Sequence, residues 1–169
     1  NFSARNLHDE NLLKRVIDGQ TQRALRSGLL ELELTEGSIM QNAEFALNLL
    51  YEMKGYGIPL YIDDFGTGYS SLSYLQKLPV DYIKIDQSFV SNMSENPNSA
   101  MIVSSTIELV KNLGRTTVAE GVETIEDWQR LRALGCDYAQ GYLIAKPMPA
   151  ELFLAWADAF SPARLLEPK

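Results

Sequence analysis

The stretch YIDDFGTGYSS at residues 61–71 places two adjacent carboxylates, Asp63 and Asp64, at the end of an apolar run. The run is typical of a buried strand, and a turn containing Gly66 and Gly68 follows it. One of two adjacent carboxylates could lie between two metal ions, and the other could bind one of those ions. A pair of metal ions held in this way activates a water for phosphoryl displacement. A single strand-end Asp more often caps the next helix or turn. The neighbouring segments therefore decide between these interpretations.

Other predicted strands also end in polar side chains. These are Glu33 and Glu36 in ELELTE, Lys84 and Asp86 in YIKID, Glu120 and Glu123 in VAEGVE, and Gln140 in YAQGY. In parallel α/β folds ligands bind at this carboxyl edge of the sheet. Carboxylates that converge there repel each other and must hold protons or bind cations. His8 is the single histidine and Cys136 the single cysteine, so the hard oxygen ligands favour Mg²⁺, Mn²⁺ or Ca²⁺ over zinc. Lys84 would add positive charge near a phosphate or an attacking water.

Strand and helix patterns alternate along the chain. The hydrophobic spacing predicts strands at 29–36, 58–64, 80–86, 115–123 and 138–145, and helices at 9–26, 43–54, 70–79, 99–113, 124–135 and 149–160. Alternation with apolar strands favours parallel βαβ units. An open doubly wound sheet and a TIM-type (β/α)8 barrel both fit this pattern. No G-x-G-x-x-G motif follows a predicted strand, which argues against a dinucleotide-binding open sheet.

Composition indicates one domain over residues 1–169 and excludes several classes of protein. Apolar residues make up 46% and charged residues 22%, as in ordinary globular proteins. The net charge of −7 leaves no basic footprint, so we expect no nucleic-acid polymer as a partner. One cysteine fits a reducing compartment, and no apolar run approaches the ~18 residues of a membrane span. We therefore expect a cytoplasmic location.

Six segments resemble one known family, in the order in which that family carries them. They are NFSARNL (1–7), ELTE (33–36), DDFGTGYSSLSYL (63–75), KIDQSFV (84–90), AEGVET (119–124) and QGYLIAKPMP (140–149). Together they resemble the EAL domain family of bacterial cyclic di-GMP phosphodiesterases. The resemblance implies a TIM-type (β/α)8 barrel that hydrolyses cyclic di-GMP to linear pGpG with Mg²⁺ or Mn²⁺ in a two-metal site.

The resemblance also implies a role for each site residue. The implied metal ligands are Asn1, Glu33, Asp63 and Asp64, with Asp63 bridging the two ions. Lys84 would contact water or metal, Glu120 would be the general base, and Glu36 would hold the 65–71 loop. The residues implied to position or contact substrate are Asp86, Glu123 and Gln140. The implied partners are cyclic di-GMP, a second copy in a homodimer, and sensory or diguanylate-cyclase-like domains in a longer chain. Such a parent chain could be tethered to a membrane.

One departure from the family shapes the expected fold. The Glu-Ala-Leu segment that names the family, and whose Glu completes the metal site, does not occur in the sequence. About five strands are predicted, whereas a TIM barrel has eight. We therefore expect an incomplete barrel, the C-terminal two-thirds of an EAL domain, with poor activity by itself. Strands supplied by another chain or a rearranged open fold are the structural alternatives, and a noncatalytic cyclic di-GMP receptor or a dimerisation module the functional ones.

Overall fold

The structure is a computed structural model that describes residues 2, 9, 11–22, 24–26, 28–40, 43–68 and 72–162. Its centre is a parallel five-stranded sheet. The strands are β1 (Leu32–Thr35), β2 (Leu60–Phe65), β3 (Tyr82–Ile85), β4 (Thr116–Ala119) and β5 (Tyr138–Ala139). Their order in the sheet is the order of the chain, β1-β2-β3-β4-β5. At the edge of β1 that faces away from β2, Phe2 forms a further parallel bridge to Leu34.

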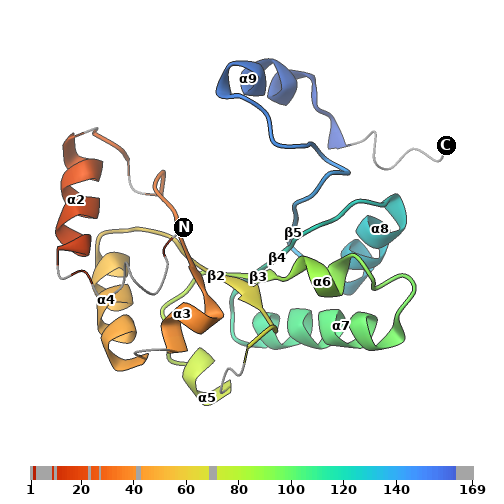
Figure 1. Ribbon diagram of the computed structural model, residues 1–169, viewed down its shortest axis with the longest axis horizontal. Helices are drawn as coiled ribbons and strands as arrows, with labels where there is room; N and C mark the ends of the chain where they lie inside the picture. Colours follow the sequence, from red (N-terminus) through yellow and green to blue (C-terminus); the bar gives the residue numbers. More distant parts are fainter. Residues whose placement is uncertain are drawn as a thin grey trace.

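This strand order decides between the two predicted architectures. A doubly wound sheet reverses its strand order part-way, which sends helices to both faces. Here every step between strands goes in one direction, and right-handed crossovers then place the connecting helices on a single face. Helices α4 (Ala43–Gly55), α7 (Pro97–Asn112) and α8 (Ile125–Leu134) lie on the outer side of the strands, and the inner side is open (Figure 1). The prediction of an incomplete α/β barrel is confirmed.

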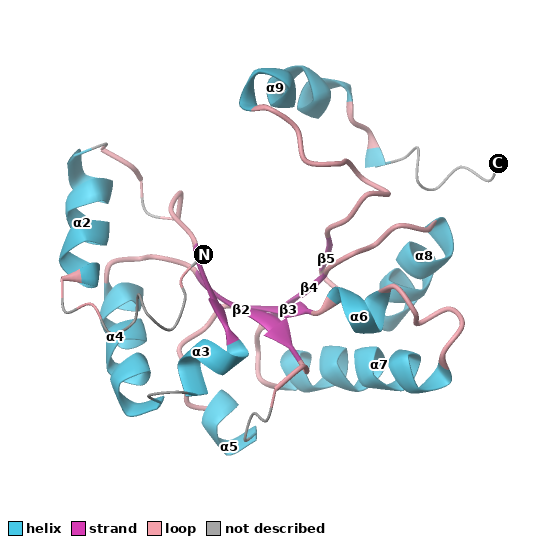
Figure 2. Ribbon diagram, viewed as in Figure 1, coloured by secondary structure: helices cyan, strands magenta, loops and turns pink. Residues whose placement is uncertain are grey.

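The remaining helices test the predicted pattern more finely. Helices α2 (Leu12–Gln22), α5 (Leu72–Leu75) and α9 (Ala150–Ala159) fall inside predicted helices. Two short helices were not predicted, namely α3 (Glu36–Met40) after β1 and α6 (Gln87–Val90) after β3 (Figure 2). The predicted strand 29–36 was therefore wrong at its end, because Glu36 opens α3. A helix of four or five residues has too few turns to leave a periodic signal in the sequence.

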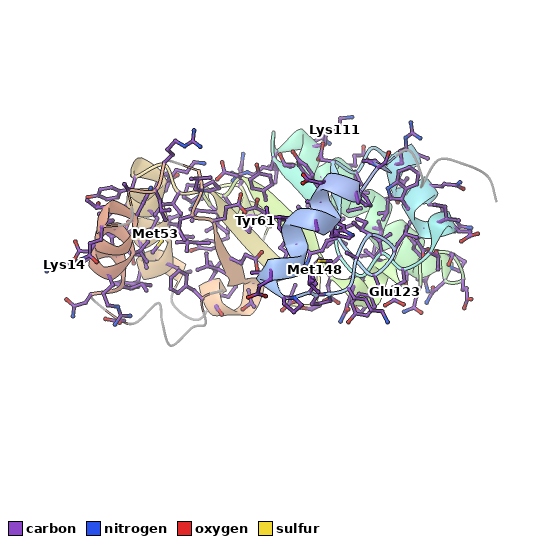
Figure 3. All side chains as sticks on the ribbon, turned by 90° about the horizontal axis from the view of Figure 1, so that it is seen from above. Lys14, Met53, Tyr61, Lys111, Glu123 and Met148 are labelled. Carbon is purple, nitrogen blue, oxygen red and sulfur yellow. The ribbon has the colours of Figure 1, made fainter. Side chains whose placement is uncertain are left out.

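Alternate residues of the strands form the core against the helices. Leu34, Ile62 and Ile83 are fully buried on the helix-covered face, where Leu50 and Met53 of α4 pack. A second cluster joins Ile85 and Ala119 of the strands to residues of α6, α7 and α8. Figure 3 shows Met53 and Lys14 at the α2–α4 end of the molecule and Tyr61 in the middle. Hydrophobic burial thus holds one face of the sheet and leaves the other face for polar side chains.

Strand β5 is much shorter than the predicted strand 138–145, and the prediction was wrong beyond Ala139. The chain turns at Gly141 instead, because Leu143 N–H donates to the Val122 carbonyl at 3.0 Å and draws the segment over the end of β4. The two backbones cross so closely that a Cβ on Gly141 would overlap the oxygen and nitrogen of Val122. A glycine is required here for close approach of two backbones.

Helix α9 differs from the other long helices because none of its residues is buried. It stands apart from the outer helices, beyond the open side of the sheet (Figure 1). Its exposed apolar side chains are Leu152, Phe153 and Leu154. Within the part of the chain that the structure describes, no helix has both the length and the apolar character needed to cross a bilayer.

The crossing at Gly141 gives a stability prediction. We expect Gly141→Ala to lower the free energy of unfolding by about 1–3 kcal/mol, because the added methyl group can be accommodated only by moving backbone. Gly55→Ala is the matched control, since an added Cβ there meets open space at the end of α4, and we expect it to be neutral or stabilising. Urea denaturation of both variants measures the difference. Equal stability of the two variants would contradict the close crossing.

Candidate active site

Three strands place charged side chains on the open face of the sheet. Successive strand residues point to opposite faces. Glu33 lies between buried leucines of β1, Asp63 follows the buried Ile62, and Lys84 lies between the buried Ile83 and Ile85. The alternation that buries one set of side chains under the helices therefore turns the other set toward the open side. The two-residue period of each strand is therefore what places Glu33, Asp63 and Lys84 on the same face of the sheet.

Lys84 is the centre of the resulting charge cluster. Its side chain is only 5% exposed. Its Nζ lies 3.3 Å from Glu33 Oε1, 2.9 Å from Asp63 Oδ1 and 2.8 Å from Glu120 Oε1. A buried ammonium is stable only when paired and hydrogen-bonded, and these three carboxylates from β1, β2 and the end of β4 supply that pairing. The cluster therefore joins three segments that are distant in the sequence.

A local irregularity brings Asp64 to the same side as Asp63. The pairing of β2 with β3 shifts register between Ile62 and Phe65, and Asp64 has φ +54°. In a regular strand two adjacent side chains would point to opposite faces. A residue in the left-handed region disrupts that alternation, and Asp is one of the few non-glycine residues that tolerate it. The backbone at Asp64 thus explains how two adjacent acids serve one site.

The carboxylates that meet here match the requirements of a divalent cation. Asp63, Asp64 and Glu120 each offer an oxygen, and the three oxygens lie within 4.8 Å of one another. Two oxygens on opposite sides of one cation, each at about 2.4 Å, would be separated by about that distance. Hard oxygen donors are the ligands that Mg²⁺, Mn²⁺ and Ca²⁺ prefer. The residues present therefore fit a divalent metal.

Burial and mutual repulsion shift the pKa values in the cluster. Burial raises the pKa of Glu120, Lys84 opposes that rise, and the charges of Asp63 and Asp64 add to it. Burial and the neighbouring charges of Asp63 and Asp86 raise the pKa of Asp64. Burial alone would lower the pKa of Lys84, but its hydrogen bonds to Glu120 and Asp63 raise it well above the ordinary value. The lysine therefore stays charged, and two of the acids ionise less readily than free carboxyl groups.

Glu36 lies beneath the start of the glycine-rich loop rather than in the charge cluster. It is only 4% exposed, and its Oε2 accepts a hydrogen bond from Gly66 N–H at 3.0 Å. A Cβ on Gly68 would lie 2.7 Å from Glu36 Oε1, so the loop passes directly over this carboxylate. The predicted loop-holding role has the required contact at Gly66, while residues 69–71 lie outside the described part of the chain.

A cavity of about 350 Å³ adjoins the cluster. Its lining includes Asp64 and Glu120 together with Asp86, Glu123 and Gln140. Asp86 has a structural role as well, because its Oδ1 accepts a hydrogen bond from Ser88 N–H at 3.0 Å and caps α6. The side chains of Glu123 and Gln140 are exposed at the cavity. Apart from Glu36 and Asn1, the sequence-predicted residues thus lie in a carboxylate–lysine cluster or in the adjoining polar cavity.

The structure brings some of the predicted site residues together, and its cavity includes others that were not predicted. The structure brings together Glu33, Asp63, Asp64, Lys84 and Glu120, as their positions at strand ends led us to expect. Asn1 lies outside the described residues, although its neighbour Phe2 donates a backbone hydrogen bond to Glu33 at 2.8 Å. The cavity lining also includes Gln87 and Tyr142, which the sequence did not single out. The sequence indicated them only by their positions, because Gln87 follows the strand-end Asp86 and Tyr142 lies two residues after Gln140.

The sequence matches the EAL domain family over residues 1–147. The chain belongs to the EAL domain family. This EAL chain is 40% identical over 155 residues to MucR of Pseudomonas aeruginosa, a bifunctional diguanylate cyclase/cyclic di-GMP phosphodiesterase, with 92% of this chain and 23% of that protein covered. It is also 40% identical over 149 residues to the cyclic di-GMP phosphodiesterase NbdA of the same organism, with 88% and 19% covered. The EAL chain thus spans about a fifth of the length of these relatives.

Solved EAL structures support the fold and the type of site. The PaMucR phosphodiesterase in complex with c-di-GMP has a TM-score of 0.88 and 39% identity, covering 90% of this chain and 62% of that one. BlrP1 of Klebsiella pneumoniae in complex with manganese and cy-diGMP has a TM-score of 0.77 and 33% identity, covering 84% and 36%. The manganese complex belongs to that protein, and the acidic cluster of this EAL chain fits a divalent metal independently.

The backbone at Asp64 gives a prediction for the EAL chain without metal. We expect Asp64→Asn to be at least as stable as the wild type at neutral pH, because it removes repulsion with Asp63 and Asp86 while Asn tolerates positive φ. Asp64→Ala should be less stable than Asp64→Asn by about 1 kcal/mol, because Ala is strained in the left-handed region. Urea denaturation in a chelator compares the two variants. Equal free energies of unfolding would rule out the left-handed conformation at this position.

The raised pKa values give a second prediction. A carboxyl group with a raised pKa contributes stability that is present at low pH and lost as pH rises through that pKa. We expect the metal-free wild type to lose stability relative to Glu120→Gln as the pH rises from 4.5, the ordinary pKa of a glutamate, toward neutral pH. Added Mn²⁺ should restore more stability at the upper pH, because metal binding needs deprotonated carboxylates. Glu108→Gln, an exposed change on α7, is the control that should follow the wild type. A constant difference between wild type and Glu120→Gln across this range would refute the shift.

Proposed function

We propose that this EAL chain is part of a metal-dependent phosphodiesterase that hydrolyses cyclic di-GMP to linear pGpG, and that residues 1–169 alone have poor activity. The observation that carries the proposal is the grouping of Asp63, Asp64 and Glu120 around the buried Lys84. The substrate follows from the relatives, which include proteins named cyclic di-GMP phosphodiesterases. A phosphodiester is an anion, and an acidic site of this kind needs cations before it can accept one.

The proposed metal ligands are Glu33, Asp63 and Asp64, together with Asn1. The fit rests on the distance between the described carboxylate oxygens and on their chemistry as hard donors. A bound pair of Mg²⁺ or Mn²⁺ ions would activate water and stabilise charge on the phosphate. Lys84 then has two functions, because it holds Glu33 and Asp63 in place and adds a fixed positive charge at the reacting centre.

Glu120 is the proposed general base. Its pKa is raised from the ordinary carboxyl value, which is the direction that favours a general base, because efficient bases have a pKa closer to the working pH. The water oxygen forms a bond to phosphorus and its proton passes to Glu120. The bond from phosphorus to the ribose 3′ oxygen breaks, and that oxygen takes up a proton from solvent to become a hydroxyl group. The product keeps its phosphate on the 5′ oxygen, as pGpG requires. The hydrogen bond from Lys84 orients the Glu120 carboxylate for this transfer.

The other predicted residues act around this centre. Glu36 is proposed to hold the loop by accepting a hydrogen bond from Gly66 N–H. Asp86, Glu123 and Gln140 are proposed to position or contact substrate because they line the adjoining cavity. A noncatalytic receptor would need neither a base nor a buried lysine beside its ligand site. The joint presence of Glu120 and Lys84 therefore favours the enzyme over the receptor and over a dimerisation module.

The proposal predicts hydrolysis that depends on one carboxylate. The full-length natural protein, including any sequence beyond residues 1–169, is incubated with cyclic di-GMP and Mg²⁺ or Mn²⁺, and pGpG is quantified by chromatography. We expect Glu120→Gln to reduce turnover at least about 100-fold, since a positioned general base contributes about that much or more. Binding of cyclic di-GMP should persist in this variant. The exposed Glu108→Gln should leave turnover unchanged.

Three outcomes separate the candidate functions. Production of pGpG that Glu120→Gln abolishes supports the phosphodiesterase. Tight binding of cyclic di-GMP with no product from the wild type selects the receptor. Absence of both binding and turnover leaves the dimerisation module, which analytical ultracentrifugation would then examine.

A further inference from the structure

The turn that follows β5 carries an aromatic side chain at the cavity and is attached to the neighbouring backbone by hydrogen bonds. Gln140 N–H donates to the Ala119 carbonyl at 2.8 Å, Val122 N–H donates to the Gln140 carbonyl at 3.1 Å, and Leu143 N–H donates to the Val122 carbonyl at 3.0 Å. The Leu143 side chain packs against the second hydrophobic cluster. Tyr142 precedes it and lines the cavity instead. The turn is therefore fixed to the end of β4 on both sides of Tyr142.

Tyr142 combines an exposed aromatic ring with a position at the cavity. Its side chain is 56% exposed, although it stands on a fixed turn and borders the cavity. An exposed aromatic ring on a rigid support loses little conformational entropy when it binds a ligand. The attachment of the turn therefore gives Tyr142 the properties of a binding side chain rather than of a core residue.

Lys146 brings a positive charge to this ring. Its Nζ lies 5.4 Å from the centroid of the Tyr142 ring, which is within cation–π distance. The described residues that line the cavity include four carboxylates and no lysine or arginine; the carboxylates belong to Asp64, Asp86, Glu120 and Glu123. Lys146 thus places a cation beside one wall of an otherwise acidic cavity. An aromatic face next to a cation suits a flat base that is attached to a phosphate.

A cyclic dinucleotide needs such a second contact. It carries two bases and two phosphates, and the carboxylate cluster can serve only the phosphate that reacts. We propose that Tyr142 stacks on one purine base of the substrate and that Lys146 interacts with the phosphate remote from the reacting one. This inference rests on the proposed function and assigns the far half of the substrate to the turn after β5. Tyr142 and Lys146 would then determine affinity for the dinucleotide without taking part in bond cleavage.

The test compares a dinucleotide with a phosphodiester that lacks bases. In the full-length natural protein loaded with Mn²⁺, we expect Tyr142→Ala to raise KM for cyclic di-GMP roughly 5- to 100-fold, the range found for the loss of one base–aromatic stack. The kcat/KM for methyl p-nitrophenyl phosphate should not change. Tyr142→Phe keeps the ring and should retain the wild-type KM. The direct dissociation constant of cyclic di-GMP, measured by calorimetry in the Glu120→Gln background, should change in parallel with KM.

Lys146 is tested by charge and by salt. Lys146→Ala should weaken binding of cyclic di-GMP several-fold at low ionic strength and less at high ionic strength, because salt screens an exposed charge. Lys146→Arg should retain most of the affinity. Tyr56→Ala and Lys111→Ala are the matched controls; Tyr56 is 52% exposed at the end of α4, and Lys111 lies in the last turn of α7.

The outcomes distinguish this inference from the proposed function. A wild type that binds and hydrolyses cyclic di-GMP, with an unchanged KM in Tyr142→Ala, overturns the stacking role alone. An equal loss in Tyr142→Phe and Tyr142→Ala also overturns it, because the ring would then not be the group that binds. A wild type that neither binds nor hydrolyses cyclic di-GMP overturns both proposals. A selective rise in KM that Tyr142→Phe does not share supports both.

Discussion

The repulsion between carboxylates that converge on the open face of the sheet is the constraint on which the site depends. Glu33, Asp63 and Glu120 come within ion-pair distance of one ammonium group, that of Lys84. Burial is the largest cause of the raised pKa values of Glu120 and Asp64, and the charges of neighbouring acids, which a single ammonium group does not neutralise, add to it. The remaining negative charge is a fixed attraction for divalent cations. The same charge that makes these carboxylates repel one another therefore favours the binding of a divalent cation.

The fold meets this constraint by separating the two faces of the sheet. All five strands are parallel and follow the order of the chain, so their carboxyl ends lie at one edge and their helices lie on one side. Burial of residues such as Leu34 and Ile83 under the helices offsets the unfavourable electrostatics of the opposite face. The backbone at Asp64 interrupts this regular alternation within β2. That interruption adds a second carboxylate from one strand, which a regular sheet could not supply.

The sequence predicted the features that depend on period and on motif, and it missed those that depend on contact between distant segments. Strand ends identified Glu33, Asp63, Lys84 and Glu120 because parallel strands bring such residues to one edge. Nothing local indicates that Glu36 starts a helix or that Asp64 adopts positive φ, since both depend on the neighbouring loop and strand. The strand predicted at 138–145 was too long for the same reason. The segment has the apolar pattern of a strand, but after Ala139 its backbone forms hydrogen bonds with Val122 and turns away from the sheet.

The early end of β5 has a consequence for how charge is distributed around the cavity. A longer strand would carry residues 140–145 on along the sheet, with alternate side chains on opposite faces. The turn instead exposes Tyr142 at the cavity and brings Lys146 over its ring. Lys84 pairs with three carboxylates and is not among the described residues that line this cavity. The cation beside the cavity wall is Lys146, which comes from the segment that turns at the Gly141 crossing.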